Sequence, residues 1–107
     1  MAVEKLKIEA AKLEVDWWTG NAYVTLYVRN RGNSPVVLSA LYILEVDTDE
    51  LLCAEINLSY PIYEDEEEGF TVSVGGCGLV VGEKYTIRLV TKRGTEVETI
   101  ARAVAAL

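Results

Sequence analysis

The 107-residue sequence contains no histidine, no glutamine and no methionine after Met1. Without histidine, the commonest general base and the commonest metal ligand are missing, and no serine or cysteine has an imidazole to activate it. We therefore expect no catalytic residues, no bound metal and no cofactor. Few thermolabile side chains beside many Glu, Lys and Arg form a bias typical of hyperthermophile proteins, and we expect such an origin.

Long apolar runs are also missing. No segment approaches the roughly 18 to 20 apolar residues of a membrane-spanning helix. The first sixteen residues carry charges instead, from Glu4 and Lys5 to Asp16, so no secretion signal is evident. A length of 107 residues suits a single domain, and we expect residues 1–107 to form one.

Positive charge is missing from the middle of the chain. The whole sequence has 10 Lys and Arg against 17 Asp and Glu, a net charge of −7, which disfavours nucleic acid as a partner. Between Gly32 and Gly82 there are 10 acidic residues and no basic one. A solvated acidic surface explains this distribution. The alternative is that opposite ends of the domain carry opposite potentials, which would orient head-to-tail contacts in a filament.

Strand patterns account for most of the sequence. Apolar and polar residues alternate strictly over residues 21–30, which indicates a half-buried strand. Further β-type runs occupy residues 36–46, 51–58, 70–74, 85–90 and 96–104, with turn signals such as Asn30–Pro35, Asp47–Glu50 and Lys92–Thr95 between them. The pattern predicts an all-β fold, an antiparallel immunoglobulin-like β-sandwich of about seven to eight short strands.

The first segment fits two structures. Val3, Leu6, Ala10, Leu13 and Trp17 have the spacing of one helix face. However, Leu6, Ile8 and Ala10 alternate, and Ala11, Leu13 and Val15 alternate in the other phase, as a strand with a bulge at Ala10–Ala11 would require. Because Thr19-Gly20-Asn21 resembles a hairpin turn, we favour the strand.

Cys53 and Cys77 are the two cysteines of the chain. They form a disulfide if the protein is secreted or comes from a hyperthermophile, and two buried thiols if it is an ordinary cytosolic protein. Both alternatives remain open at the level of sequence. A zinc site would need ligands beyond two cysteines, in a chain without histidine.

Aromatic and acidic residues supply the candidate interaction surface. Trp17 and Trp18 are adjacent, so in a strand they point to opposite faces and only one can lie in the core. The exposed tryptophan then joins Tyr23 and Tyr27 in a patch for a neighbouring subunit or a sugar, unless these aromatics only shield the sheet. The second part of the surface is an acidic run on a loop at residues 60–69, composed of Glu64, Asp65, Glu66, Glu67 and Glu68.

The segment from Leu6 to Ile43 reads LKIEAAKLEV, a Thr19-Gly20-Asn21 turn, and VTLYVRNRGNSPVVLSALYI. It resembles the globular heads of archaeal type IV pilin-like proteins, including the pilin-like stator components of the archaellum. Residues 82–104, GEKYTIRLVTKRGTEVETIARAV, are similar to the closing hairpin of these heads. The acidic segment from Tyr60 to Glu68 has no counterpart that we can match.

The resemblance implies a non-catalytic extracellular domain that assembles a surface filament or its anchoring complex. Its partners would be copies of itself, other pilin-like proteins or an S-layer protein. Contact with a membrane would run only through an N-terminal hydrophobic helix, which is missing from this sequence. The alternative is a cell-surface module that recognises an S-layer protein or a polysaccharide through Trp17 or Trp18 and the tyrosines.

Overall fold

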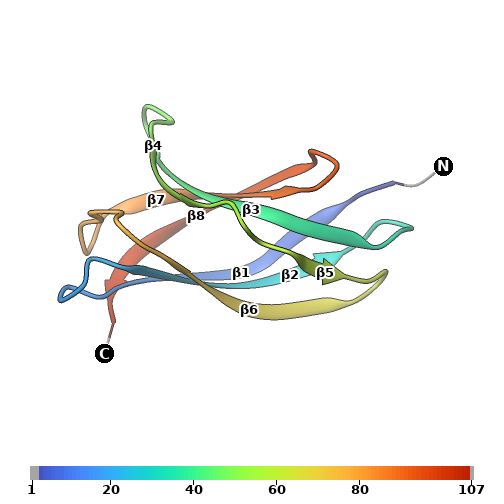
Figure 1. Ribbon diagram of the computed structural model, residues 1–107, viewed down its shortest axis with the longest axis horizontal. Coiled ribbons are helices and arrows are strands. Elements are labelled where there is room, and N and C mark those ends of the chain that lie inside the picture. The colour runs from blue at the N-terminus through green and yellow to red at the C-terminus, as the bar shows by residue number, and fades with distance from the viewer. Residues whose placement is uncertain (1–2, 107) are drawn as a thin grey trace.

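The computed structural model describes residues 3–106, which form eight strands joined by turns and loops (Figure 1). In chain order they are β1 (Leu6–Val15), β2 (Ala22–Asn30), β3 (Val36–Glu45), β4 (Leu51–Glu55), β5 (Tyr60–Ile62), β6 (Glu67–Val74), β7 (Lys84–Thr91) and β8 (Glu96–Ala105). The predicted all-β fold is confirmed. Residues 3–106 contain no helix that is long and apolar enough to cross a membrane.

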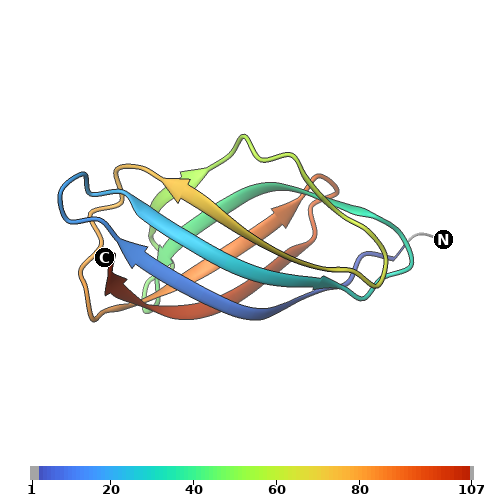
Figure 2. The ribbon, with the colours of Figure 1, turned by 90° about the horizontal axis from the view of Figure 1, so that it is seen from below.

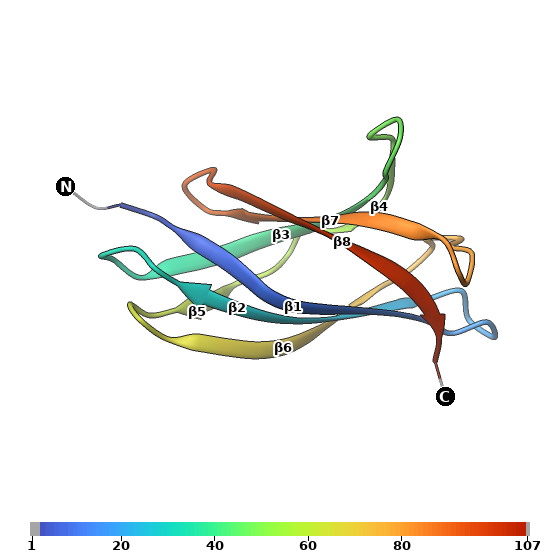
Figure 3. The same cartoon turned by 180° about the vertical axis from the view of Figure 1, so that it is seen from behind.

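The strands pack as two layers of a sandwich (Figure 2). One layer holds β1, β2 and β6, the other holds β4, β3, β7 and β8, and β5 pairs with β3. All pairings are antiparallel, as predicted, except that Leu13–Val15 of β1 pair in parallel with Ala103–Ala105 of β8. This contact joins the layers along one side, where β8 converges on β1 (Figure 3), and leaves β6 at one edge and β4 with β5 at the other.

The core fills the space between the layers. Strict alternation buries Ala22, Val24, Leu26 and Val28 of β2 completely, as the sequence pattern indicates. They face apolar side chains of the opposite layer, including Leu41, Ile43, Ile87 and Leu89. β3 is apolar on both faces, and its Leu44 is only 4% exposed although it belongs to the outward-facing series.

The first segment is a strand rather than a helix. Leu13 and Val15 point into the core, and β1 pairs with β2 along its whole length. The predicted bulge exists, but the register shifts between Ile8 and Ala10, so Glu9 is the extra residue. The predicted position was one residue too late, and Ala10 faces solvent.

Most of the predicted loop at residues 60–69 belongs to two strands, β5 and β6, which pair with different neighbours. Tyr60–Ile62 pair with residues 36–38 of β3, and Glu67 and Glu68 already belong to β6, where they pair with Arg29 and Val28. Only Glu64, Asp65 and Glu66 of the acidic run lie in the turn between them. Repulsion among the carboxylates does not prevent the pairing, because backbone hydrogen bonds to β2 and the charge of Arg29 oppose it.

Strand direction alternates except at β4 and β5, which both run antiparallel to β3. All connections within residues 3–106 other than 56–59 therefore lie at one of two ends of a molecule that measures 45 × 28 × 21 Å (Figure 1). We call one the Trp end: turn 16–21, turn 46–50, loop 75–83 and residue 106. We call the other the Asn end: residues 3–5 and the turns at 31–35, 63–66 and 92–95. The chain enters at the Asn end and leaves at the Trp end.

Candidate interaction surfaces

The turn between β1 and β2 is fixed by its own hydrogen bonds. The Asp16 amide donates to the Asn21 carbonyl at 2.9 Å, and the Gly20 amide donates to the Asp16 carbonyl at 2.8 Å. The Asp16 carboxylate accepts from the Trp18 amide at 2.9 Å. Gly20 has a φ of +75°, a conformation that glycine adopts without strain. Local chemistry thus holds the turn in one shape.

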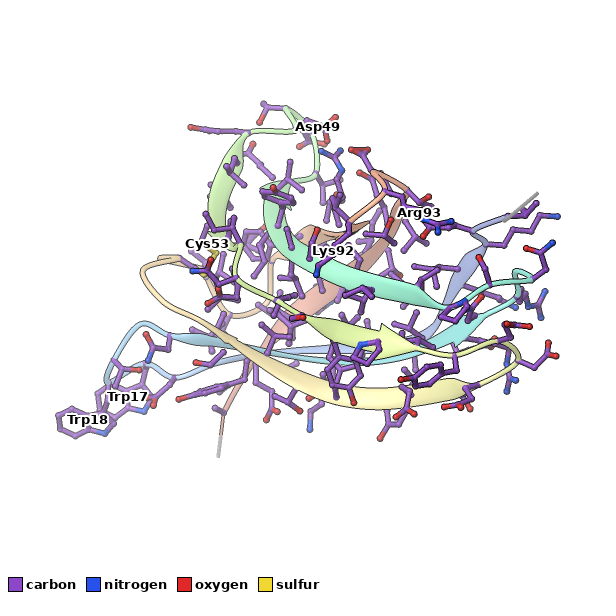
Figure 4. All side chains as sticks on the ribbon, turned by 45° about the vertical axis from the view of Figure 1, so that its right-hand side comes forward. Trp17, Trp18, Asp49, Cys53, Lys92 and Arg93 are labelled. Carbon is purple, nitrogen blue, oxygen red and sulfur yellow. A yellow bond between two sulfur atoms is a disulfide. The ribbon has the colours of Figure 1, made fainter. Side chains whose placement is uncertain are left out.

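Both tryptophans project from this turn into solvent (Figure 4). Trp17 is 71% and Trp18 is 79% exposed, and their rings stack with centroids 4.6 Å apart. The expectation that the two side chains point to opposite faces of a sheet, with one of them exposed, was wrong. It assumed that the strand continues through residue 18, whereas β1 ends at Val15, and residues in a turn do not alternate between faces.

Two valines add to the apolar surface of the Trp end. Val80 and Val81 are 58% and 52% exposed in the loop between β6 and β7. The loop is anchored because the Val80 amide donates to the Tyr85 hydroxyl at 2.8 Å and the Gly82 amide donates to the Ala103 carbonyl at 2.8 Å. Sequence reasoning missed these valines, although two adjacent valines between Gly78 and Gly82 are a visible signal.

Cys53 and Cys77 form a disulfide, so the structure has the first of the two alternatives. Cys53 lies on edge strand β4, and Cys77 lies in the loop that follows β6 on the other layer. The bond therefore links the two layers near the Trp end, on the side where no ladder joins them.

Tyr23 and Tyr27 face outward from β2, and they lie at different distances from the tryptophans. Tyr23 pairs with Ser73 near the Trp end, whereas Tyr27 pairs with Gly69 further along β6. The Tyr27 ring covers Gly69, since an added Cβ there would lie 2.6 Å from the ring. The ring of Tyr27 thus covers Gly69, while Tyr27 itself remains 48% exposed.

The acidic run lies at the opposite end from the tryptophans, so the candidate surface divides into two. Arg29 partly neutralises it, because the guanidinium lies 3.5 Å from a carboxylate oxygen of Glu67 and 3.5 Å from one of Glu9. Some loss of hydration, together with a hydrogen bond to Glu68 and repulsion from its charge, raises the pKa of Glu66. Within the acidic run, the repulsion that raises a pKa thus acts between Glu66 and Glu68, while Glu67 is paired with Arg29.

Charge does not divide the molecule into an acidic and a basic end. The connections of the Trp end contain acids and no base: Asp16, Asp47, Asp49, Glu50 and Glu83. The Asn end has both signs, with Lys5, Arg31, Lys92 and Arg93 beside Glu4, Glu64, Asp65 and Glu66. The connections of the Trp end are thus acidic, although the Arg102 guanidinium of β8 donates to the Gly82 carbonyl there at 2.7 Å, while the connections of the Asn end are balanced.

At the Asn end, a buried asparagine organises three segments. Asn30 is 0% exposed, and its Nδ2 donates to the carbonyls of Ser34 and Ile62, both at 2.9 Å. Its Oδ1 accepts from the Gly32 amide at 2.9 Å. Asn30 therefore fixes the turn after β2 and ties it to β5. The bond from the Gly32 amide gives a physical reason for an Asn with a Gly two residues later at this turn.

A shallow groove of about 310 Å³ crosses the outer face of the second layer. It is lined by Tyr42, Leu44, Leu51, Arg88, Val90 and Glu96. Arg88 forms an ion pair with Glu98 beside it, which raises the pKa of the arginine. The sequence did not reveal the groove, because its walls come from four strands whose register only the fold defines.

Within residues 3–106, no group of three or more Cys, Asp or Glu side chains is placed to hold a metal ion.

The sequence matches no protein-family model and no curated protein. A β-glucosidase structure from Listeria innocua matches with 10% identity and a TM-score of 0.49, over 98% of this chain and 16% of that chain. The structure of Dpr1 IG1 bound to DIP-eta IG1 matches with 13% identity and a TM-score of 0.43, over 95% and 96%. Similarity at this level does not extend to function.

Proposed function

We propose that the chain is a non-catalytic structural and assembly domain of an archaeal pilin-like surface filament or of the complex that anchors it. The observation that carries the proposal is the Trp end, where two stacked indole rings extend into solvent from a turn of fixed shape. Exposed aromatic clusters of this kind favour contact with another molecule. A rigid aromatic loses little conformational entropy when it is covered, so it suits a protein contact.

The extracellular location rests on the disulfide between Cys53 and Cys77. Disulfides persist in oxidising compartments, and also inside hyperthermophile cells. We therefore test location directly, by measuring the intact unreduced mass of the native protein in separated cell fractions. Extra mass in a membrane or filament fraction would support the proposal. A mass equal to these 107 residues in the cytosol would contradict it.

Assembly is tested by sedimentation velocity over a range of protein concentrations. We expect the wild type to self-associate and the double variant Trp17→Ser/Trp18→Ser to stay monomeric. The matched control is Tyr63→Ser, which removes a 53% exposed aromatic at the Asn end and should leave association unchanged. Loss of association in the control alone, or a monomeric wild type at every concentration, would refute the assembly role of the Trp end.

A second candidate is a module that binds a surface polysaccharide or an S-layer protein. It is supported by the outer faces of the stacked Trp17 and Trp18 rings, because aromatic faces pack well against sugar rings. Binding on a glycan array without self-association would favour this module. Concentration-dependent oligomers without glycan binding would favour the assembly domain.

A further inference from the structure

The chain enters and leaves the sandwich at opposite ends of its long axis (Figures 1 and 3). β1 begins at the Asn end, and β8 finishes at the Trp end. The two strands run in parallel where they meet, with Leu13–Val15 opposite Ala103–Ala105. The Ala106 amide extends this contact by donating to the Val15 carbonyl at 2.9 Å.

This arrangement determines how tension between residues 3 and 106 would act. Tension draws β1 toward the Asn end and β8 toward the Trp end, so the two parallel strands slide past each other. Their hydrogen bonds run across the strands and bear the force together. In a ladder opened from one end, by contrast, the bonds break one after another and each meets the full force alone.

β1 is held at its entrance as well. The Glu4 carboxylate accepts hydrogen bonds from the hydroxyls of Thr91 at 2.7 Å and Thr95 at 2.6 Å, and its side chain is only 7% exposed. The Arg31 amide donates to the Lys5 carbonyl at 2.7 Å. These hydrogen bonds of Glu4 to Thr91 and Thr95 are called the Glu4 clasp below. Tension applied at residue 3 acts on the Glu4 clasp before it acts on the hydrogen bonds between β1 and β8.

We propose that the β1–β8 contact and the Glu4 clasp form a mechanical clamp, and that the domain resists tension along its long axis. The inference goes beyond the proposed function, because it requires only that force act between the two ends of the chain. The disulfide adds a limit to extension: after the clamp breaks, the segment between Cys53 and Cys77 stays closed.

Single-molecule force spectroscopy on the full chain tests the clamp in two pulling directions. Tension between the two termini shears β8 against β1. Tension between the C-terminus and a clickable side chain at Thr19, both at the Trp end, opens the same contact from one end. We expect a rupture force several-fold higher between the termini. Equal forces, or a lower force between the termini, would overturn the proposal, and this comparison needs no variant of the clamp.

Two substitutions at one position then locate the clamp. Val104 pairs with Glu14 of β1, beyond the last residue that pairs with β7. Val104→Pro removes an amide from the parallel ladder and should lower the rupture force between the termini, whereas Val104→Ala keeps the amide and should not. Glu4→Ala should also lower the rupture force between the termini. Lys92→Ala is the control and should leave this force unchanged. Unchanged forces in both Val104→Pro and Glu4→Ala would place the resistance elsewhere.

The extension measured after rupture checks the disulfide. The two cysteines are separated by 24 positions, so reduction should lengthen the released chain by roughly 80 Å at about 3.6 Å per residue. Assembly and clamping are tested by different readouts, and a monomeric protein with a strong clamp would refute only the proposed function.

Discussion

The two ends of the sandwich are held together by different chemistry. At the Asn end, buried polar side chains make the connections, since Asn30 joins three segments and Glu4 joins β1 to the β7–β8 turn. At the Trp end, a covalent bond between Cys53 and Cys77 joins the layers, and the large apolar residues Trp17 and Trp18 are left exposed. The comparison indicates that buried hydrogen bonds hold one end, whereas a covalent bond beside exposed apolar side chains holds the other.

The largest effect is expected where the polar network is broken. Asn30→Ala leaves the buried Ile62 carbonyl and the partly buried Ser34 carbonyl and Gly32 amide without these partners, so the free energy of unfolding should fall by about 3 to 5 kcal/mol. Urea denaturation followed by circular dichroism measures the loss. Asn57→Ala is the matched control, because Asn57 is exposed, and its effect should stay within about 0.5 kcal/mol. Equal losses of unfolding free energy in both variants would contradict the claim that the buried hydrogen bonds of Asn30 stabilise the Asn end.

Removing the covalent link should come next in size. The double variant Cys53→Ala/Cys77→Ala opens a closed loop with a sequence separation of 24, and we expect a loss of about 3 kcal/mol. The two cysteines lie away from Asn30, so the losses should add when all three residues are changed. A triple variant that loses much less or much more than the sum would show that the two ends are not independent.

Sequence reasoning predicted the elements whose pattern one strand carries by itself. β2 and the Lys92–Thr95 turn were predicted correctly, because alternation and turn residues are local signals. The predicted core position of one tryptophan failed, since nothing local marks the end of β1 at Val15. The groove beside Tyr42 and the pairing of Glu67 with Arg29 were missed, because they depend on register between strands distant in the sequence.

The candidate site was predicted in the same uneven way. Trp17 and Trp18 were identified as an interaction surface from their type alone, and their exposure is consistent with that hypothesis. The acidic run lies at the other end of the molecule and Tyr27 lies further along β2, so these candidate residues do not adjoin as a single surface. Residue type indicates which side chains favour contact, but only topology decides which of them act together.

The smallest effect concerns the acidic turn of the Asn end, and it depends on pH. The pKa of Glu66 is raised, so the folded state binds this proton more tightly than the unfolded state does. The resulting stability is fully present below the ordinary pKa of glutamate and is lost as pH rises through the raised value. Glu66→Gln should therefore match the wild type at low pH and slightly exceed its stability at neutral pH, as judged from urea midpoints.

Glu68→Gln sharpens this test, because Glu68 supplies both the hydrogen bond and the repulsion that act on Glu66. It should remove only part of the same pH dependence, because the loss of hydration at Glu66, the largest cause of its raised pKa, is still present. If Glu66→Gln kept the pH dependence of the wild type, the acidic turn would not be its source. If Glu66→Gln removed it and Glu68→Gln reduced it, the acidic turn would be a small electrostatic cost at the Asn end, outweighed there by the buried hydrogen bonds of Asn30 and Glu4.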